Sequence, residues 1–147
     1  MAIEEGDFKT RIELEEGYRF IIHFDDERTS DFYMDEPAPL GTGEYPNAGK
    51  FLAAAVGNCL CASLTYCVRR HHAEMNSLWA EVYTTLGRNE KGRLRITNII
   101  VKLHPEVSDE LKLDRCRDLF EDFCIVTESV KNGVPIQVQI EQTKKEG

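Results

Sequence analysis

One long apolar helix constrains this chain more than any other feature. From about Ala48 to His71, two adjacent stripes recur at i, i+4 spacing. They comprise Phe51, Ala55, Cys59, Ser63 and Cys67, and Leu52, Val56, Leu60, Leu64 and Val68. The remaining faces carry mostly small residues, so the helix is apolar almost all round and needs cover on nearly every side. One chain of 147 residues has difficulty supplying that cover, which predicts a dimer that shares the helix.

The segments before the helix are typical of β-strands. Phe8, Thr10, Ile12 and Leu14 alternate with charged residues, the period of a half-buried strand. A second strand is predicted over 19–24 and a short third one over 32–34. Residues 35–47 are rich in Pro and Gly, which predicts a loop.

The segments after the helix predict a hairpin, two helices and a closing strand. Strands over 78–86 and 94–103 are joined by a turn at 89–92. Ser108 is expected to cap a helix of about four turns, with Leu111, Leu119 and Phe123 facing inward. A shorter helix should begin just after Cys124 and end at Asn132-Gly133, and 134–140 should form a strand. The predicted fold is one α+β domain over residues 1–147, in the order βββ-α-ββ-αα-β, with largely antiparallel strands.

Charge and composition narrow the possible functions and locations. A net charge of -8 argues against nucleic acid and against an anionic membrane surface. The first seven residues lack the basic and apolar regions of a secretory signal, and the apolar run over 51–64 is too short to span a bilayer. We therefore expect a cytoplasmic protein, in which thiols stay reduced.

Five cysteines are an odd number, which speaks against a structural disulfide framework and leaves core thiols, a metal site or redox chemistry. Cys59, in the apolar helix, is either a small buried hydrophobe or an attacking thiol that needs a nearby cation. Cys124 lies at a predicted helix N-terminus, which would lower its pKa, although a plain core cysteine fits equally well. Nothing singles out Cys61 or Cys67, and both are interpreted as core or near-surface thiols.

A zinc site is the competing use of these residues. Cys59-x-Cys61 with His71, His72, Cys116 and Cys124 offers enough ligand types. However, a Cys-x-Cys pair inside a helix points its sulfurs about 200° apart, which suits tetrahedral zinc poorly. We therefore expect no metal, and His71-His72 is interpreted as a solvated helix end. No phosphate-binding glycine loop or serine-nucleophile motif is present.

Two stretches of the sequence resemble the OsmC/Ohr family. The first runs from Met34-Asp35-Glu36-Pro37 through the Gly-rich loop and Pro46-Asn47 to the helix segment Phe51–Leu60 around Cys59. The second is Cys124–Val130 followed by Gly133-Val134-Pro135-Ile136. With the order of elements, the resemblance covers most of the chain, from about Tyr18 to Ile140.

The resemblance implies an intertwined homodimer and a thiol-dependent peroxidase that prefers organic hydroperoxides. Cys59 would be the attacking thiol, oxidised to a sulfenic acid, and Cys124 would form a disulfide with it. An external dithiol, typically a lipoylated protein in the family, would reduce the pair. The resemblance implies no metal or other cofactor, and Arg19 is the best match to the family's active-site arginine.

The sequence departs from the family at the position of an early-helix glutamate, where it has Gly49 and Lys50. Ile125 follows Cys124 where many members have Pro, and Thr127 replaces the usual Ser. These departures keep a second hypothesis open, in which the dimer is a non-catalytic binding module for a small apolar ligand.

Overall fold

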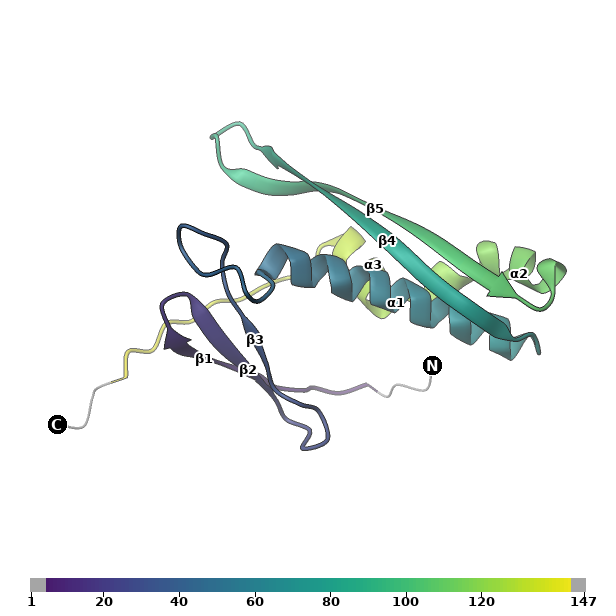
Figure 1. Cartoon of the computed structure of the whole chain (residues 1–147), viewed down its shortest axis with the longest axis horizontal. Helices are drawn as coiled ribbons and strands as arrows, with labels where there is room; N and C mark the ends of the chain where they lie inside the picture. Colours follow the sequence, from purple (N-terminus) through teal and green to yellow (C-terminus); the bar gives the residue numbers. More distant parts are fainter. Residues whose placement is uncertain (1–4, 144–147) are drawn as a thin grey trace.

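The computed structural model describes residues 5–143 (Figure 1). Residues 1–4, on which the expected lack of a secretory signal partly rests, lie outside this range. The elements, in chain order, are β1 (Thr10–Glu16), β2 (Arg19–Phe24), β3 (Phe32–Met34), α1 (Ala48–Arg70), β4 (Met75–Arg88), β5 (Leu94–Val107), α2 (Glu110–Arg117), the 3-10 helix η1 (Phe120–Phe123) and α3 (Ile125–Asn132). The predicted α+β class and the order of elements up to α3 are confirmed.

The central helix α1 begins and ends for local reasons. The Asn47 side chain accepts a hydrogen bond from the backbone N–H of Lys50 at 2.9 Å and so caps the first turn. Arg69 and Arg70 lie in the last turn, where cations suit the helix dipole. His71 closes the helix, and its backbone N–H donates to the carbonyl of Cys67.

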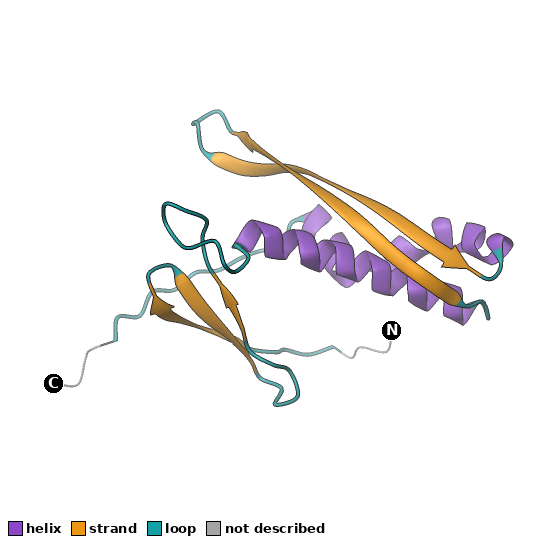
Figure 2. Ribbon diagram, in the orientation of Figure 1, coloured by secondary structure: helices purple, strands orange, loops and turns teal. Residues whose placement is uncertain are grey.

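A long two-stranded hairpin covers one side of α1 (Figure 2). β4 and β5 have 14 residues each and pair antiparallel, with two register shifts. The Asn89 side chain accepts from the backbone N–H groups of Lys91 and Arg93, which forms the predicted turn. Helix and hairpin approach closely at Gly57, where an added Cβ would lie 2.6 Å from Cγ2 of Val82. Gly57 therefore sets the distance between α1 and β4.

The segment α2–η1–α3 packs on the same central helix (Figure 1). Asp109 caps α2, so the prediction that Ser108 is the cap is wrong; the Ser108 hydroxyl instead accepts from the backbone N–H of Glu74 at 2.9 Å. The predicted four-turn helix is also wrong, because α2 ends at Arg117 and a 3-10 turn follows. The predicted stop at Gly133 is confirmed, with φ of 71° at that glycine.

The N-terminal strands form a separate three-stranded antiparallel sheet in the order β1-β2-β3. It lies near the beginning of α1 (Figure 1), and the Phe32 and Phe51 rings are 4.9 Å apart. Every residue of β1 is exposed. The sheet is therefore attached to the rest of the chain mainly through one aromatic contact region.

Two buried clusters form the core around α1. The first contains Leu64, Cys67, Val68, Ala73 and Cys116, and the second contains Val56, Leu60 and Cys124. Leu103 and Phe120 pack against both clusters. Four of the five cysteines, all except Cys61, are therefore concentrated where α1 meets α2, η1 and α3.

Two further predictions about packing are wrong for the described chain. Leu111, Leu119 and Phe123 are exposed, by 75% in the case of Leu111. Residues 134–140 form no strand within the part of the chain that the structure describes, and Val134, Ile136, Val138 and Ile140 are all exposed. A strand needs a sheet edge to pair with, and no edge of either sheet pairs with this segment.

By length and composition alone α1 could cross a membrane, since it has 23 residues and a mean hydropathy of 1.7 over its most apolar window. The argument from the short run over 51–64 therefore understated the length of the apolar helix. Core helices meet the same criterion, and α1 packs against β4, β5, α2, η1 and α3. This packing favours a core helix.

Candidate active site

The structure brings the two predicted thiols together in one cluster. Cys59 lies in the middle of α1 and is half-buried, whereas Cys124 is fully buried between η1 and α3. Cys59 packs against the cluster that contains Cys124, and the interaction between the two thiols raises the pKa of Cys124. The pairing implied by the family resemblance is therefore spatially available.

The environment of Cys124 differs from the one that the sequence predicted. Burial raises the pKa of the Cys124 thiol, the interaction with Cys59 raises it further, and the Thr127 hydroxyl lowers it in part. The thiol donates a hydrogen bond to Thr127 Oγ1 at 2.9 Å and does not cap the backbone of α3. The predicted net lowering of this pKa is wrong, because desolvation and the interaction with Cys59 outweigh the hydrogen bonds with Thr127. The raised pKa keeps the Cys124 thiol protonated at neutral pH, and Cys59 is the more accessible of the two thiols.

A largely apolar cavity of about 590 Å³ shares residues with the cluster that contains the two thiols, although neither cysteine lines it. It lies between α1, β5 and the η1–α3 segment, and seven of its lining residues belong to or pack against the cluster that contains Cys124, among them Val56, Leu60 and Phe120. Thr127, the partner of Cys124, lines it as well, and Glu121 and Lys131 contribute an ion pair at 3.6 Å. The cavity suits a small molecule with an apolar body.

Arg19 is held within its own sheet. Its guanidinium donates to the carboxylates of Glu15 at 3.0 Å and Glu16 at 3.3 Å, and it lies over the Tyr33 ring at 6.0 Å. No hydrogen bond or ion pair joins it to Cys59 among the described residues. The role of Arg19 at the thiol stays a prediction.

The loop that leads into α1 is organised by the buried carboxylate of Asp35. It accepts from the Thr42 hydroxyl at 2.7 Å and from the backbone N–H groups of Glu36 and Thr42. The hydrogen bond from the Thr42 hydroxyl is the largest cause of a lowered Asp35 pKa, and the Arg19 charge adds to it. Gly41 is required here, because an added Cβ would collide with Asp35 Oδ1 and with the carbonyl of Glu36. The Asp-x-Pro and Gly-rich part of the motif thus builds a rigid entry to the helix.

Sequence reasoning missed a second cysteine pair. Cys67 of α1 and Cys116 of α2 form a disulfide, with Cα atoms 5.9 Å apart. The expectation that the chain has no structural disulfide, and that Cys67 is a plain thiol, is therefore wrong. The missed signal is register: Cys67 follows Cys59 by eight residues and Cys116 precedes Cys124 by eight. Two antiparallel segments that bring one pair together also bring the other together.

His71 completes this second cluster and is not a solvated helix end. Its Nδ1 lies 3.8 Å from both sulfurs and 2.8 Å from the carbonyl oxygen of Cys67. These three residues, rather than the Cys59-x-Cys61 set, are the metal-ligand types that the described chain gathers. However, a carbonyl oxygen can only accept, so Nδ1 carries a proton and is not free to bind a metal through that atom.

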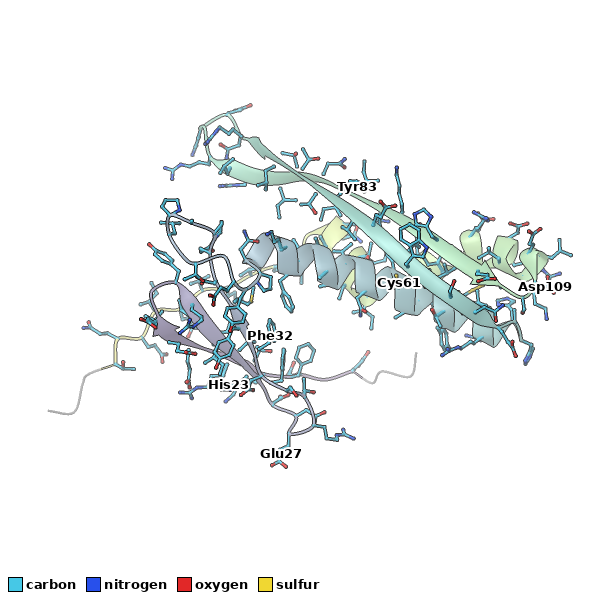
Figure 3. All side chains as sticks on the ribbon, viewed as in Figure 1. His23, Glu27, Phe32, Cys61, Tyr83 and Asp109 are labelled. Atoms are coloured by element: carbon cyan, nitrogen blue, oxygen red, sulfur yellow. A yellow bond between two sulfur atoms is a disulfide. The ribbon has the colours of Figure 1, made fainter. Side chains whose placement is uncertain are left out.

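Cys61 is the remaining free thiol. It is half-buried on another face of α1, and burial raises its pKa. Figure 3 labels it on the helix below the hairpin. No described cysteine other than Cys61 lies outside the two pairs.

The chain also matches a known protein family. The family model described as OsmC-like protein matches residues 41–139, which include both cysteine pairs. The chain belongs to the OsmC family.

Solved structures of OsmC and Ohr proteins share the fold at low sequence identity. An OsmC-like protein of Vibrio cholerae has a TM-score of 0.74 and 15% identity, over 86% of this chain and 95% of that one. An OsmC-like protein of Mycoplasma pneumoniae has a TM-score of 0.74 and 14% identity, over 88% and 91%. The organic hydroperoxide resistance protein OhrB of Bacillus subtilis has a TM-score of 0.56 and 19% identity, over 87% and 93%.

No curated protein sequence matches the chain significantly. Family membership and the paired cysteines of this OsmC protein support a redox role.

Proposed function

We propose that this protein is a thiol peroxidase that reduces organic hydroperoxides through Cys59 and Cys124. The observation that carries the proposal is the shared cluster of a half-buried and a fully buried thiol beside an apolar cavity. The more accessible thiol suits the attacking role, and the buried one suits the resolving role.

The reaction would proceed in three balanced steps. The Cys59 thiolate attacks the terminal oxygen of R-OOH, the O–O bond breaks, and R-O⁻ takes up a proton to leave as R-OH. Cys124 then attacks the sulfur of the Cys59 sulfenic acid, and water leaves as the disulfide forms. An external dithiol reduces that disulfide by two exchanges and becomes a disulfide itself. A lipoylated protein is the reductant that we propose on family grounds.

The cavity supports an organic rather than an inorganic peroxide. Its lining is dominated by aliphatic side chains of α1 and β5, among them Leu52, Ile99 and Val101. Burying an apolar R group there gains roughly 0.8 kcal/mol per CH₂, and hydrogen peroxide gains none of this. We therefore expect a preference for cumene hydroperoxide that falls as the alkyl group shortens.

Arg19 is the cation that we propose to favour the Cys59 thiolate. Its side chain is 24% exposed and is oriented by ion pairs with Glu15 and Glu16. In the family an early-helix glutamate pairs with the arginine, and this chain has Gly49 and Lys50 at that position. We expect Arg19→Gln to slow peroxide consumption, because an opposite charge brought next to a thiol favours its ionised, nucleophilic form.

The exposed area supports a homodimer. The chain exposes 12,094 Å², whereas a monomer of 16.8 kDa typically exposes about 7,700 Å². The excess, about 4,400 Å² per chain, exceeds the roughly 1,000–2,500 Å² that each partner of an obligate dimer buries, so a second copy could cover a large part of it. Much of it is apolar, on β1, on the hairpin and on the exposed 134–140 segment, represented by Ile12, Leu14, Trp79, Ile100 and Ile136. We propose that a second copy covers these surfaces, and sedimentation equilibrium would test it.

The decisive experiment is peroxide consumption by the purified protein. Cumene hydroperoxide and then hydrogen peroxide would be supplied with dithiothreitol, and wild type compared with Cys59→Ser, Cys124→Ser and the matched control Cys61→Ser. We expect Cys59→Ser to abolish turnover, Cys124→Ser to accumulate sulfinic acid at Cys59, and Cys61→Ser to behave as wild type. Equal turnover by wild type and Cys59→Ser would refute the proposal.

A non-catalytic binding module is the second candidate, favoured by the missing early-helix glutamate and by the apolar cavity. It predicts no turnover with any peroxide, together with binding of an apolar fluorophore that Leu60→Lys abolishes. If iodoacetamide does not alkylate Cys59 in the folded protein, the result would favour this candidate.

A location in the cytoplasm stays a prediction.

A further inference from the structure

We propose that the Cys67–Cys116 disulfide is a positioning device: it fastens the α2–η1 segment to α1 so that Cys124 stays next to Cys59. Cys67 and Cys116 would thus act on the second chemical step through Cys124 without touching the peroxide. The chemical relevance of this device rests on the proposed peroxidase function, although the geometric effect can be measured without it.

The register of the two pairs is the first argument. On α1, Cys67 follows Cys59 by eight residues, and on the other segment Cys116 precedes Cys124 by eight. The two segments therefore run antiparallel and are matched at two levels, about 12 Å apart along α1. A bond between Cys67 and Cys116 therefore also fixes the position of Cys124 relative to Cys59.

The disulfide itself is well placed to act as a permanent link. Its Cα separation of 5.9 Å lies within the usual range for disulfides, about 4.4–6.8 Å. Cys67 is 1% exposed and Cys116 is fully buried, in a cluster with Leu64, Val68 and Ala73. A dithiol reductant cannot reach these sulfurs without opening the core, so the link would persist while Cys59 and Cys124 cycle.

The chain between Cys116 and Cys124 can transmit the constraint. Backbone hydrogen bonds run from Leu119 N–H to the Cys116 carbonyl at 3.1 Å, from Asp122 to Leu119 at 3.3 Å, and from Cys124 to Glu121 at 3.0 Å. Phe120, in the middle of this stretch, packs against both core clusters. The eight residues therefore behave as one short, packed unit.

Such a link is needed because this unit is weak on its own. α2 has eight residues and η1 has four, and helices this short are marginal without tertiary support. Leu111 and Leu119 are exposed and add little packing. The disulfide is the one covalent attachment of the described α2–η1–α3 segment to α1.

The experiment follows formation of the Cys59–Cys124 disulfide in wild type, in the Cys67→Ala/Cys116→Ala variant and in the control Cys61→Ala. After one equivalent of cumene hydroperoxide without reductant, quenched samples are resolved by mass. We expect the paired variant to form the Cys59 sulfenic acid within twofold of the wild-type rate. Its Cys59–Cys124 disulfide should form at least tenfold more slowly, with more sulfinic acid. A variant that is merely unstable would slow both steps, and equal rates of disulfide formation would overturn the proposal.

Diamide, which oxidises two thiols to a disulfide and is itself reduced to a hydrazine, removes the dependence on peroxidase activity. The paired variant should again form the Cys59–Cys124 disulfide at least tenfold more slowly than wild type, even if no peroxide is consumed. Alkylation of unreduced, denatured wild type should label three thiols. Labelling of five thiols, or one retained zinc ion per chain, would overturn the proposal and leave the peroxidase function standing.

Discussion

Adding one methyl group at Gly57 should push α1 away from the hairpin. The Cβ of Gly57→Ala would lie 2.6 Å from Cγ2 of Val82, whereas ordinary contacts between carbons are about 3.5–4.0 Å. One side must therefore move by about 1 Å. Val82 has little freedom to turn away, because it is β-branched and lies in β4 opposite Val101.

The expected energy combines two opposing effects. Overpacking of this kind costs about 1–3 kcal/mol, whereas replacing Gly by Ala inside a helix stabilises by about 1 kcal/mol. Gly57→Ala should therefore destabilise by up to about 2 kcal/mol. In a Val82→Ala background the collision is absent, and the same change should stabilise by up to about 1 kcal/mol.

A double-mutant cycle isolates the collision from both background effects. Urea unfolding of wild type, Gly57→Ala, Val82→Ala and the double variant at one fixed protein concentration should give a coupling energy of about 1–3 kcal/mol. Gly49→Ala is the control, because its Cβ would meet only Asn47 Oδ1 at 3.7 Å. The same shift should slow peroxide consumption by Gly57→Ala, since α1 and β5 together line the cavity. A coupling energy below about 0.5 kcal/mol would refute the close approach.

Three further predictions concern the disulfide and the loop before α1. Removing the Cys67–Cys116 link, which joins positions 49 residues apart, should cost up to about 4 kcal/mol by loop entropy; a reductant strong enough to open the bond should lower the melting temperature of wild type but not of Cys67→Ala/Cys116→Ala. The pKa of Asp35 is lowered in the folded state, so the ionised carboxylate stabilises the fold at pH values above its unfolded pKa of about 3.9. This stabilisation is lost as the pH falls through the folded pKa. Asp35→Asn should therefore be less stable than wild type at pH 7, and acid unfolding should show the difference shrinking below about pH 4. Gly41→Ala should disrupt the loop by displacing Asp35, which limited proteolysis would detect as cleavage within 35–46, while Gly49→Ala stays resistant.

The sequence was most informative where one local pattern decides the structure. The two stripes of α1, the Asn89–Gly92 turn and the Gly133 stop each depend on neighbouring residues, and the structure has all three. Boundaries were less certain, because capping side chains compete: Asp109 was preferred over the adjacent Ser108, whose hydroxyl bonds across to Glu74.

Tertiary effects account for what the sequence did not predict. The N-terminal position of Cys124 suggested a lowered pKa, but full burial reverses the sign. The strand expected over 134–140 alternates correctly, yet alternation cannot supply the sheet edge that a strand requires. Ile140, 94% exposed, lies in a segment that pairs with no strand of the described chain.

The distribution of the cysteines follows from one constraint imposed by the apolar helix. α1 needs cover, and the short α2–η1–α3 segment supplies part of it. The two cysteine pairs along that contact suit different roles because their surroundings differ. Cys67 and Cys116 are buried near the C-terminal end of α1 beside His71, where their disulfide is protected from solvent. Cys59 and Cys124 share the cluster next to the cavity, where we propose that a bond forms and is reduced in turn. The same antiparallel contact thus provides one pair suited to permanence and one suited to turnover.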